Sequence, residues 1–578
     1  MEREETGAVL TTDHEECAAL VEVLVAQGVR NAVVSPGSRN APLIVAFARE
    51  KRIAKHVIVD ERSAAFAAVG MTQCTGEPVA VVCTSGSAVL NYAPAVSEAF
   101  YRHLPIIIVS ADRPAEWIDQ NDSQTIRQPG ALASVVKHTC DIPACAGRQW
   151  WVNRMVNEAA IIAKRAPRGP VHINVQLAEP LCGTSPRPNG LARIIDDVEV
   201  MRHARYDIVE DCARAIVESK RVMIVVGVMP HDKHLAHMLA DEFSWRANVV
   251  VLTESISNMS GEGIITTIDR TLSAIPAGKE ADYAPDLLIT MGGALVTRML
   301  KNFLRSNPAM EEWRIGIDHN VIDTMQHLSK RFEVEPVGFF RQVLTSIELQ
   351  GYRKSESDYA MLWRFARNRA KEAHKAFIAA APWCDLKAFS MLLPLIPRDT
   401  DLHLSNGTSI RYAQLFEATQ VHRSYCNRGV AGIDGSTSTA LGSSLVNPDR
   451  LTLLITGDMS LLYDISGLAS MHNSPRFKIV VMCNGGGGIF RFIKGPSELD
   501  ELEQYFEVSR SLPIDRYAQA FGFGYHEASN EEELGVAIQQ FFADSGAAIL
   551  AIHTPSTLNA DVLRRYFAAI REKSGEKR

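Results

Sequence analysis

The stretch Leu451–Ser460, LTLLITGDMS, is an apolar run that ends abruptly in Gly457 and Asp458. A second run, Phe477–Met482, ends in the same manner, in Asn484 and four consecutive glycines. Continuous apolar runs of this length are typical of strands that are buried on both faces of a parallel sheet. Ligands bind beyond the carboxyl ends of such strands, so the polar residues after these two runs are the first candidates for a site.

Similar runs recur along the whole chain, each followed by a polar or Gly-rich turn and a helical pattern. They are Ala32–Ser35, Val57–Asp60, Val79–Thr84, Pro105–Ser110 and Val171–Val175 in a first block, Val222–Val228, Asn248–Thr253, Asp286–Met291 and Arg314–Asp318 in a second, and Asp401–Leu404, Leu451–Thr456, Phe477–Met482 and Ala547–His553 in a third. This alternation predicts an α/β fold with three doubly wound parallel-sheet domains.

Two segments set the expected domain boundaries. Cys182–Gly190, CGTSPRPNG, is a Pro- and Gly-rich linker. Gly351–Arg369 is polar and is predicted to be a helix that joins the second block to the third. We therefore expect domains at residues 1–184, 185–360 and 361–578.

The composition excludes several classes of protein. Apolar residues make up 46% and charged residues 22% of the 578 positions, which is globular composition and excludes a disordered, collagen-like or disulfide-scaffold chain. The net charge of −7 disfavours a general nucleic-acid binder. The ten cysteines form no CxxC pair, which favours reduced thiols in a cytoplasmic protein. Met1–Thr6 has no apolar signal-peptide segment, and no apolar run approaches the ~18 residues of a membrane span.

The strand ends at Asp458 and Asn484 have the chemistry of a magnesium site. Mg²⁺ takes oxygen ligands, keeps some waters and usually shares its coordination with substrate phosphates. One carboxylate, one amide carbonyl and one glycine backbone carbonyl would leave positions for two diphosphate oxygens and a water. A plain flexible glycine loop is the alternative interpretation.

In the first block, the turn Ser35–Asn40 follows a predicted strand. Gly37 and Ser38 would let a ligand approach the backbone, and Arg39 offers a bidentate fork for a carboxylate or phosphate. An ordinary strand-to-helix turn would have the same pattern.

The pair Asp60 and Glu61 stands between a predicted strand and a helix expected at Ala64–Met71. Two carboxylates at this place could belong to a site. Either of them could also simply cap the helix.

The turn Cys83–Asn91, CTSGSAVLN, is rich in hydroxyl groups and opens a helix, so its free N–H groups could bind an anion. It has neither the GK[ST] of a P-loop nor a GxGxxG dinucleotide fingerprint. The GxSxG frame is also missing, which excludes an α/β-hydrolase.

Gly457-Asp458, followed 26 positions later by Asn484, resembles the cofactor motif of thiamine-diphosphate-dependent enzymes. Met459 and Cys483 depart from that motif, but neither departure removes a proposed ligand. Further motifs occur in the order Ser35–Leu43, Asp60–Arg62, Cys83–Ser87, Ser110–Pro114, Gln124–Gln128, Asn427–Gly429, Gly432–Gly435 and Asp458–Asp464. Together they resemble the MenD family, the 2-succinyl-5-enolpyruvyl-6-hydroxy-3-cyclohexene-1-carboxylate synthases of menaquinone biosynthesis.

The resemblance implies a reaction and an assembly. The enzyme would decarboxylate 2-oxoglutarate and add the succinyl semialdehyde unit in a 1,4 sense to isochorismate. The first block would be the pyrimidine-binding domain and the third the diphosphate-binding domain. In this superfamily the cofactor lies between those domains of two different subunits, which implies a homodimer or homotetramer.

The resemblance also implies residue roles. Asp458, Asn484 and the carbonyl of Gly486 would hold Mg²⁺ (or Mn²⁺) on the diphosphate. Glu61 matches the glutamate that hydrogen-bonds N1′ of the aminopyrimidine, and Ile433 matches the apolar residue that supports the bent cofactor. The other implied cofactor contacts are Ser85, Gly86, Asn406, Gly457, Met459, Ser460, Gly487, Ile489 and Phe490. The implied catalytic and substrate-binding residues besides Glu61 are Ser38, Arg39, Arg113, Gln124, Arg298, Arg411 and Arg428.

The chain departs from the family pattern at three places. Arg298-Met299 stands where family members often have Lys-Arg, Ser123 where Asn is common and Gly407 where Ser is common. These departures bear on substrate contacts and leave the cofactor prediction unchanged.

Two other functions stay open. One is a different thiamine-diphosphate enzyme, such as an acetolactate-synthase-like carboligase or a 2-oxoacid decarboxylase. The many arginines disfavour it, because pyruvate carries only one carboxylate. The other is a non-catalytic cofactor-binding protein, which the presence of Glu61, Asp458 and Asn484 disfavours. No dinucleotide fingerprint is present in the second block, and we predict that it binds no FAD or NAD.

Overall fold

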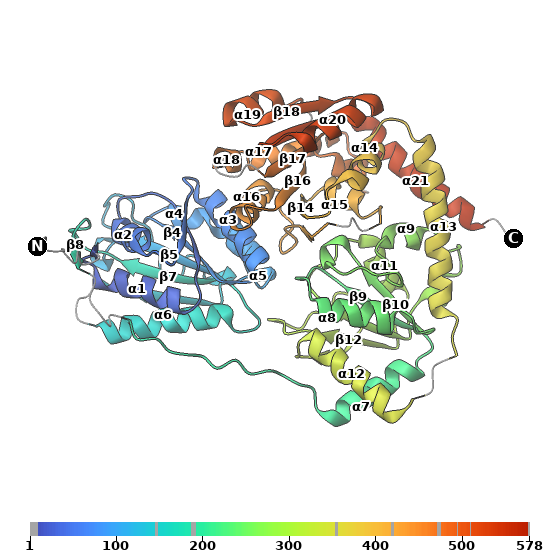
Figure 1. Ribbon diagram of the computed structural model, residues 1–578, viewed down its shortest axis with the longest axis horizontal. Coiled ribbons are helices and arrows are strands. Elements are labelled where there is room, and N and C mark those ends of the chain that lie inside the picture. The colour runs from blue at the N-terminus through green and yellow to red at the C-terminus, as the bar shows by residue number, and fades with distance from the viewer. Residues whose placement is uncertain are drawn as a thin grey trace, which may run out of the picture. The chain divides into compact units, whose positions relative to one another are not determined.

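The computed structural model describes residues 10–144, 148–186, 192–352, 356–417, 421–470, 476–493, 495–508 and 510–575. These residues form three parallel sheets flanked by helices (Figure 1), with strand orders β3-β2-β4-β5-β7-β6, β10-β9-β11-β12-β13 and β15-β14-β16-β17-β19-β18. All neighbouring strands in the three sheets are parallel. The predicted α/β class with doubly wound parallel sheets is confirmed.

The chain divides into two compact units. The first unit comprises residues 1–199, 429–448 and 463–474, and the second comprises residues 200–428, 449–462 and 475–578. Part of the predicted third block therefore belongs with the first sheet. The three domain boundaries expected from the sequence stay a prediction.

The first sheet lies in the first unit. Its strands are β2 (Asn31–Val34), β3 (Ala54–Val57), β4 (Val79–Cys83), β5 (Ile106–Asp112), β6 (His138–Ile142) and β7 (Val171–Gln176). Its helices are α1 (Glu15–Ala26), α2 (Ala41–Arg49), α3 (Glu61–Thr75), α4 (Ala88–Asn91), α5 (Ala93–Tyr101) and α6 (Gln149–Lys164). Every residue of β4 and β5 is buried, as the apolar runs predicted.

Two predictions for this unit are wrong in detail. The strand expected at Val57–Asp60 is β3, which ends at Val57 on the edge of the sheet, and Asp60 instead caps α3. Val57 and Val59 are exposed, so their apolar character did not mark a buried strand. The linker expected at Cys182–Gly190 contains strand β8 (Thr184–Pro186), which pairs antiparallel with β1 (Leu10–Thr12). Residues 187–190 of that linker lie outside the described residues.

Helix α3 packs closely against α16 (Ser436–Val446) within the first unit. A Cβ on Gly70 would lie 1.9 Å from the carbonyl oxygen of Thr439, and a Cβ on Gly442 would lie 1.9 Å from that of Ala67. Neither glycine has a positive φ, so the close approach of the two helix backbones is what requires them. This contact joins the helix that begins at Glu61 to the segment that follows Gly435.

Replacing Gly70 by Ala is expected to destabilise the protein by about 2 kcal/mol or more, because the added methyl group collides with a backbone that cannot move aside cheaply. The matched control is Gly535→Ala in helix α20 (Glu531–Ala543), where nothing lies within 4 Å of the added Cβ. That change should be neutral or stabilise by up to about 1 kcal/mol, through helix propensity alone. Denaturant unfolding of both variants measures the difference. Equal stabilities would show that α3 and α16 do not pack as described.

The central sheet lies in the second unit. Its strands are β9 (Val222–Val226), β10 (Val249–Thr253), β11 (Leu287–Met291), β12 (Glu311–Ile315) and β13 (Leu328–Phe332). Its helices are α7 (Tyr206–Glu218), α8 (Lys233–His237), the π-helical η3 (Met238–Phe243), α9 (Ile268–Ser273), α10 (Glu280–Tyr283), α11 (Arg298–Ser306) and α12 (Pro336–Gln350).

Two expectations for the central block need correction. The strand predicted at Arg314–Asp318 is β12, which ends at Ile315, because Asp318 turns back to bind the Arg314 guanidinium at 2.9 and 3.0 Å. The helix predicted at Gly351–Arg369 starts at Tyr359 and not at Gly351, and residues 353–355 of the predicted range lie outside the described residues. Gly351 ends α12 with a φ of 61°, and α13 (Tyr359–Ala380) begins later. A glycine in the left-handed region is a common helix C-terminus.

The third sheet also belongs to the second unit. Its strands are β14 (Thr400–Leu404), β15 (Arg423–Tyr425), β16 (Leu451–Gly457), β17 (Phe477–Cys483), β18 (Gly524–Ala528) and β19 (Ala548–His553). Helices α14 (Asp385–Leu392), α15 (Thr408–Ala413), α17 (Asp458–Tyr463), α18 (Ser466–Ala469), α19 (Ile514–Phe521), α20 and α21 (Ser556–Gly575) complete the third block, with α18 in the first unit. Adjacent strands β14, β16 and β17 end side by side, which brings the first candidate residues together.

Among the residues that the structure describes, no single helix is long and apolar enough to cross a membrane. The segments Tyr359–Ala380 and Asp385–Leu395 pass the same test only as a pair bent by 107°. Leu386, Phe389 and Leu392 of this pair are buried in the core beneath the third sheet.

Candidate active site

The carboxylate of Asp458 ties the ends of β16 and β17 together. Its Oδ1 accepts a hydrogen bond from the N–H of Met459 at 2.7 Å, and its Oδ2 accepts one from the N–H of Gly485 at 2.9 Å. Asp458 is 3% exposed, and burial raises its pKa to about 6. One buried carboxylate therefore links the ends of the two strands that the sequence analysis identified.

Asp385 orients Asn484, and the sequence did not predict this role. The Nδ2 of Asn484 donates to Asp385 Oδ2 at 2.9 Å, and the hydroxyl of Thr554 donates to the other carboxylate oxygen at 2.5 Å. Because the amide nitrogen is bound to Asp385, the Oδ1 of Asn484 is the end of that amide left to act as a ligand. Asp385 opens helix α14 in a segment with no recognisable motif, so sequence alone gave no signal for it.

The glycine run is shaped by specific contacts. Gly485 and Gly486 have φ values of 86° and 141°, in the region that favours glycine. A Cβ on Gly487 would lie 2.9 Å from the carbonyl oxygen of Phe506, and the N–H of Gly487 donates to the Glu507 carbonyl at 2.8 Å. Arg491 binds the Glu507 carboxylate and fixes the loop that carries Ile489 and Phe490. These contacts are not those of a plain flexible loop.

These donors fit a hard divalent cation. Asp458 offers a carboxylate, Asn484 an amide carbonyl at 6% exposure, and Gly486 a backbone carbonyl that also accepts from the N–H of Gly488 at 2.8 Å. Within the described part of the chain, no group of three or more His, Cys, Asp or Glu side chains is placed to hold a metal ion. A metal at this edge would therefore depend on amide and backbone oxygens and on a ligand that supplies more, as Mg²⁺ bound to a diphosphate does.

In the first unit, the turns after β2 and β4 interlock. A Cβ on Gly37 would lie 2.3 Å from the side chain of Thr84. The hydroxyls of Thr84 and Ser85 are buried and have no hydrogen-bond partner among the described residues. A ligand with polar atoms would satisfy such hydroxyls, because a buried polar group without a partner is costly.

Gln124 lies against Gly86, with a φ of 53° and its carbonyl oxygen 3.3 Å from the position of a Cβ on that glycine. A buried network lies behind the two. The N–H of Gly86 donates to the Oε1 of Gln128 at 3.1 Å, and Gln128 Nε2 donates to Asn174 Oδ1 at 2.7 Å. Asn174 in turn donates to the carboxylate of Asp112 at 2.9 Å. Gln128 and Asn174 were not predicted as site residues, although Gln128 ends a quoted motif.

The two carboxylates after β3, Asp60 and Glu61, make different contacts in the structure. Asp60 caps α3 by accepting from the N–H groups of Arg62 and Ser63, so Glu61 is not needed as the cap. Glu61 is the first residue of α3 and is half-buried. Burial raises the pKa of the Cys83 thiol in the hydroxyl-rich turn, and the charge of the Glu61 carboxylate raises it further.

The predicted cationic residues fall in both units. In the first, Arg39 is 5% exposed and binds the Leu177 carbonyl and the Glu179 carboxylate, and Arg113 pairs with Asp122 at 2.8 Å. In the second, Arg298 is exposed at the start of α11, while Arg428 is buried and donates to Asn406 Oδ1 at 2.8 Å. Arg411 donates to the Gly407 carbonyl. Gly407 itself has a φ of 96°, which suits glycine at the place where family members often have Ser.

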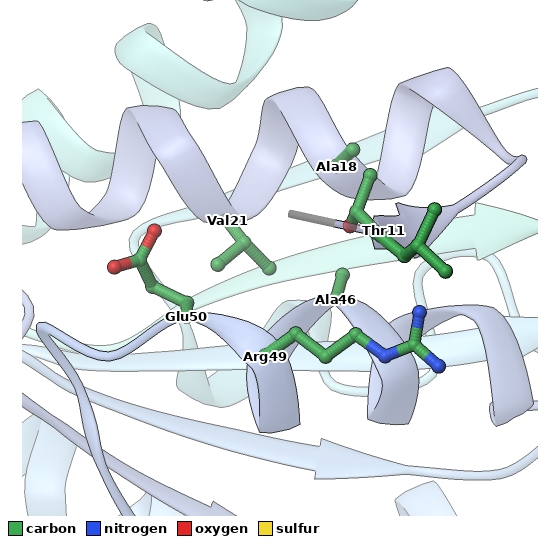
Figure 2. Close-up of a pocket in the computed structure, with 7 residues that line it drawn as sticks. Thr11, Ala18, Val21, Ala46, Arg49 and Glu50 are labelled. Atoms are coloured by element: carbon green, nitrogen blue, oxygen red, sulfur yellow. The ribbon is translucent and has the colours of Figure 1, made fainter. Parts of the chain in front are cut away.

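The remaining predicted residues are spread along the same turns. Ser38 is exposed after β2, and Ile433 is 37% exposed in the first unit. Ser460 is buried and Met459 half-buried on α17, and the Phe490 ring contacts that of Phe506 at 5.5 Å between centroids. The shallow pocket between β1, α1 and α2 in Figure 2 is lined by other residues, such as Val21, Arg49 and Glu50.

Comparison with known proteins gives a consistent result. Residues 17–131 match the family described as "Thiamine pyrophosphate enzyme, N-terminal TPP binding domain", and residues 406–552 match its C-terminal TPP binding domain. A 2-succinyl-5-enolpyruvyl-6-hydroxy-3-cyclohexene-1-carboxylate synthase of Porphyromonas gingivalis is 42% identical over 573 residues, covering 98% of each chain. The chain belongs to the family of these synthases. Synthases of the same name from Flavobacterium psychrophilum and Bacteroides thetaiotaomicron are 36% and 32% identical, over 95% and 97% of this chain and 98% and 100% of theirs.

Membership in the synthase family confirms several predictions. The protein is a thiamine-diphosphate-dependent enzyme, as the Gly457-Asp458 and Asn484 motif predicted. The two matched ranges contain the turns described above, from Ser38 to Gln124 in the first and from Asn406 to Phe490 in the second. The residue-by-residue roles stay predictions.

Proposed function

We propose that this protein is a 2-succinyl-5-enolpyruvyl-6-hydroxy-3-cyclohexene-1-carboxylate synthase of menaquinone biosynthesis. It decarboxylates 2-oxoglutarate and adds the remaining four-carbon unit in a 1,4 sense to isochorismate, with release of CO₂. The similarity to synthases of that name over nearly the whole chain supports the substrates. The structural observation that carries the proposal is the Asp458 carboxylate, which joins two strand ends beside an oriented Asn484.

In the proposed mechanism, the residues of the third sheet hold the cofactor. Asp458, Asn484 and the carbonyl of Gly486 would hold Mg²⁺ (or Mn²⁺), whose charge would neutralise the diphosphate. Asp385 keeps the Asn484 amide in the orientation that this requires. Thiamine diphosphate supplies the electron sink for decarboxylation when it is bound.

Glu61 would hold a proton at N1′ of the aminopyrimidine when the cofactor is bound. The structure supports this role because Asp60 caps α3 and leaves the Glu61 carboxyl available. Ile433 would supply an apolar contact to the cofactor. The buried hydroxyls of Thr84 and Ser85, which have no partner among the described residues, would supply polar contacts in the turn after β4.

The arginines orient the substrates, which are both dicarboxylates. A guanidinium fork pairs with a carboxylate through two hydrogen bonds, which fixes direction as well as position. Arg39 and Arg113 serve this purpose in the first unit, and Arg298, Arg411 and Arg428 in the second. Ser38 and Gln124 add neutral hydrogen bonds.

We further propose three domains, at residues 1–184, 185–360 and 361–578, and a homodimer or homotetramer with the active sites between subunits. Family membership supports this arrangement. A cytoplasmic location stays a prediction, based on the cysteine pattern of the sequence. All nine cysteines that the structure describes are free thiols.

The test mixes the purified protein with thiamine diphosphate, Mg²⁺, 2-oxoglutarate and isochorismate. We expect loss of isochorismate absorbance that requires all four components, with the succinyl adduct identified by mass. If isochorismate is untouched while a 2-oxoacid still releases CO₂, the acceptor is wrong and the cofactor site is right. If no 2-oxoacid is decarboxylated with saturating cofactor, the enzyme proposal fails.

A further inference from the structure

The side chains of Met299 and Lys301 point in different directions from helix α11. Met299 packs against the core cluster beneath the central sheet. Lys301 is half-buried, and its ammonium group donates to the carbonyl oxygen of Leu295 at 3.2 Å. Residues 298 and 301 are three apart and so share one face of the helix, whereas residue 299 is rotated away from it.

Lys301 lies beside the arginines of the proposed site. The Leu295 carbonyl that accepts from Lys301 also lies 3.5 Å from Nη2 of Arg428. Burial lowers the pKa of Lys301, and the Arg428, Arg305 and Arg411 guanidiniums lower it too, while the Glu254 carboxylate raises it. Three positive charges, contributed by α11, α15 and the chain after β15, are therefore close together in the second unit.

These three cations bind only neutral acceptors in the described structure. Arg411 donates to the Gly407 carbonyl, Arg428 to Asn406 Oδ1 and Lys301 to the Leu295 carbonyl. Among the ion pairs of the described residues, none includes any of the three within 4.0 Å. The Nε of Arg428, a residue only 9% exposed, has no hydrogen-bond partner among these residues.

The two carboxylates that act electrostatically on these cations, Glu254 and Asp269, hydrogen-bond to other groups. Glu254 is 1% exposed and accepts from the N–H groups of Val296 and Thr297 at 2.8–2.9 Å. Asp269 accepts from the hydroxyl of Thr297. Both hold the first turn of α11 in place. Their charges moderate the repulsion among the cations, but their hydrogen-bonding capacity goes to the helix start, which leaves the cations available for an anion from outside.

We propose that Lys301 is a substrate-binding residue, which forms with Arg411 and Arg428 a site for a carboxylate group of the substrates. Family members often have two positive residues where this chain has Arg298-Met299. Lys301 thereby supplies the positive charge that Met299 does not provide. The inference rests on the proposed function and names a residue for it. Either 2-oxoglutarate or isochorismate can bring the carboxylate.

The test is Lys301→Met, which keeps the length of the side chain and removes its charge. We expect the KM for one or both substrates to rise roughly ten- to hundredfold, as for loss of a charged hydrogen bond, with kcat changed less than about threefold. Lys301→Arg should restore most of the loss. A rise for 2-oxoglutarate alone, or for isochorismate alone, identifies which substrate uses the site.

The matched control is Lys371→Met, the same substitution at an exposed lysine of helix α13 in the same unit. A calorimetric titration with glutarate, a dicarboxylate that cannot be decarboxylated, measures binding to the cofactor-loaded protein without turnover. If KM and glutarate affinity are the same in Lys301→Met and Lys371→Met while the wild type turns over, the inference is wrong. If the wild type itself does not turn over, the proposed function fails, and the glutarate titration alone decides the role of Lys301.

Discussion

Glu61→Gln is expected to lower kcat by about 10²–10⁴-fold, the usual loss when a proton-holding group is removed. The amide has nearly the shape of the carboxyl but cannot hold a proton at N1′ of the aminopyrimidine. Asp60 provides the cap of α3, so the variant should fold as well as the wild type. Steady-state rates with saturating thiamine diphosphate and Mg²⁺ measure the effect, and thermal unfolding checks the fold.

The control for this change is Glu77→Gln, an exposed carboxylate just beyond the other end of the same helix. It should leave both the rate and the stability unchanged. Turnover of Glu61→Gln at the wild-type rate would contradict the proposed mechanism. A large loss of stability would instead show that Glu61 supports the helix start.

The main features of the fold were predictable because buried parallel strands leave a strong pattern. Residues 79–83 and 222–226 are fully buried strands, and both runs are continuously apolar. Four edge strands, β6, β13, β15 and β18, were missed, since their sequences, HTCDI, LSKRF, RSY and GYHEA, are largely polar. Val57–Asp60 was wrongly predicted as a buried strand, because the exposed valines at this sheet edge resemble the end of a buried strand in the sequence.

The candidate site could be predicted where a polar residue or a glycine follows the end of a strand. Asp458, Asn484 and Gly86 stand directly after apolar runs, so their position could be read from the sequence. Asp385 and Asn174 could not, because their roles depend on partners 99 residues away in one case and 46 in the other. The direction of Lys301 depends on which face of α11 is buried, and that is a property of the packed core.

Asp458→Asn is expected to weaken Mg²⁺-dependent binding of thiamine diphosphate by roughly hundredfold or more, because it removes the only carboxylate among the proposed ligands. In the wild type, the two carboxylate oxygens of Asp458 accept from the N–H groups of Met459 and Gly485. The asparagine side chain has one oxygen and therefore keeps only one of these two hydrogen bonds. Turnover should be lost at ordinary Mg²⁺ concentrations, and a chelator should inactivate the wild type in the same manner, with recovery on adding Mg²⁺. A titration of thiamine diphosphate, followed by intrinsic fluorescence, measures binding without turnover. Asp515→Asn, at an exposed carboxylate in the same unit, is the control.

A mixture of the Asp458→Asn protein and the Glu61→Gln protein tests whether each active site takes its residues from one subunit or from two. Glu61 and Asp458 belong to different compact units of the chain. If each active site takes Glu61 from one subunit and Asp458 from the other, a mixed dimer contains one intact site. Random exchange should then restore about a quarter of the wild-type activity, since half of the dimers are mixed and each has one working site of two. If one chain supplies both residues, no site in the mixture is intact and the activity stays at the average of the two variants.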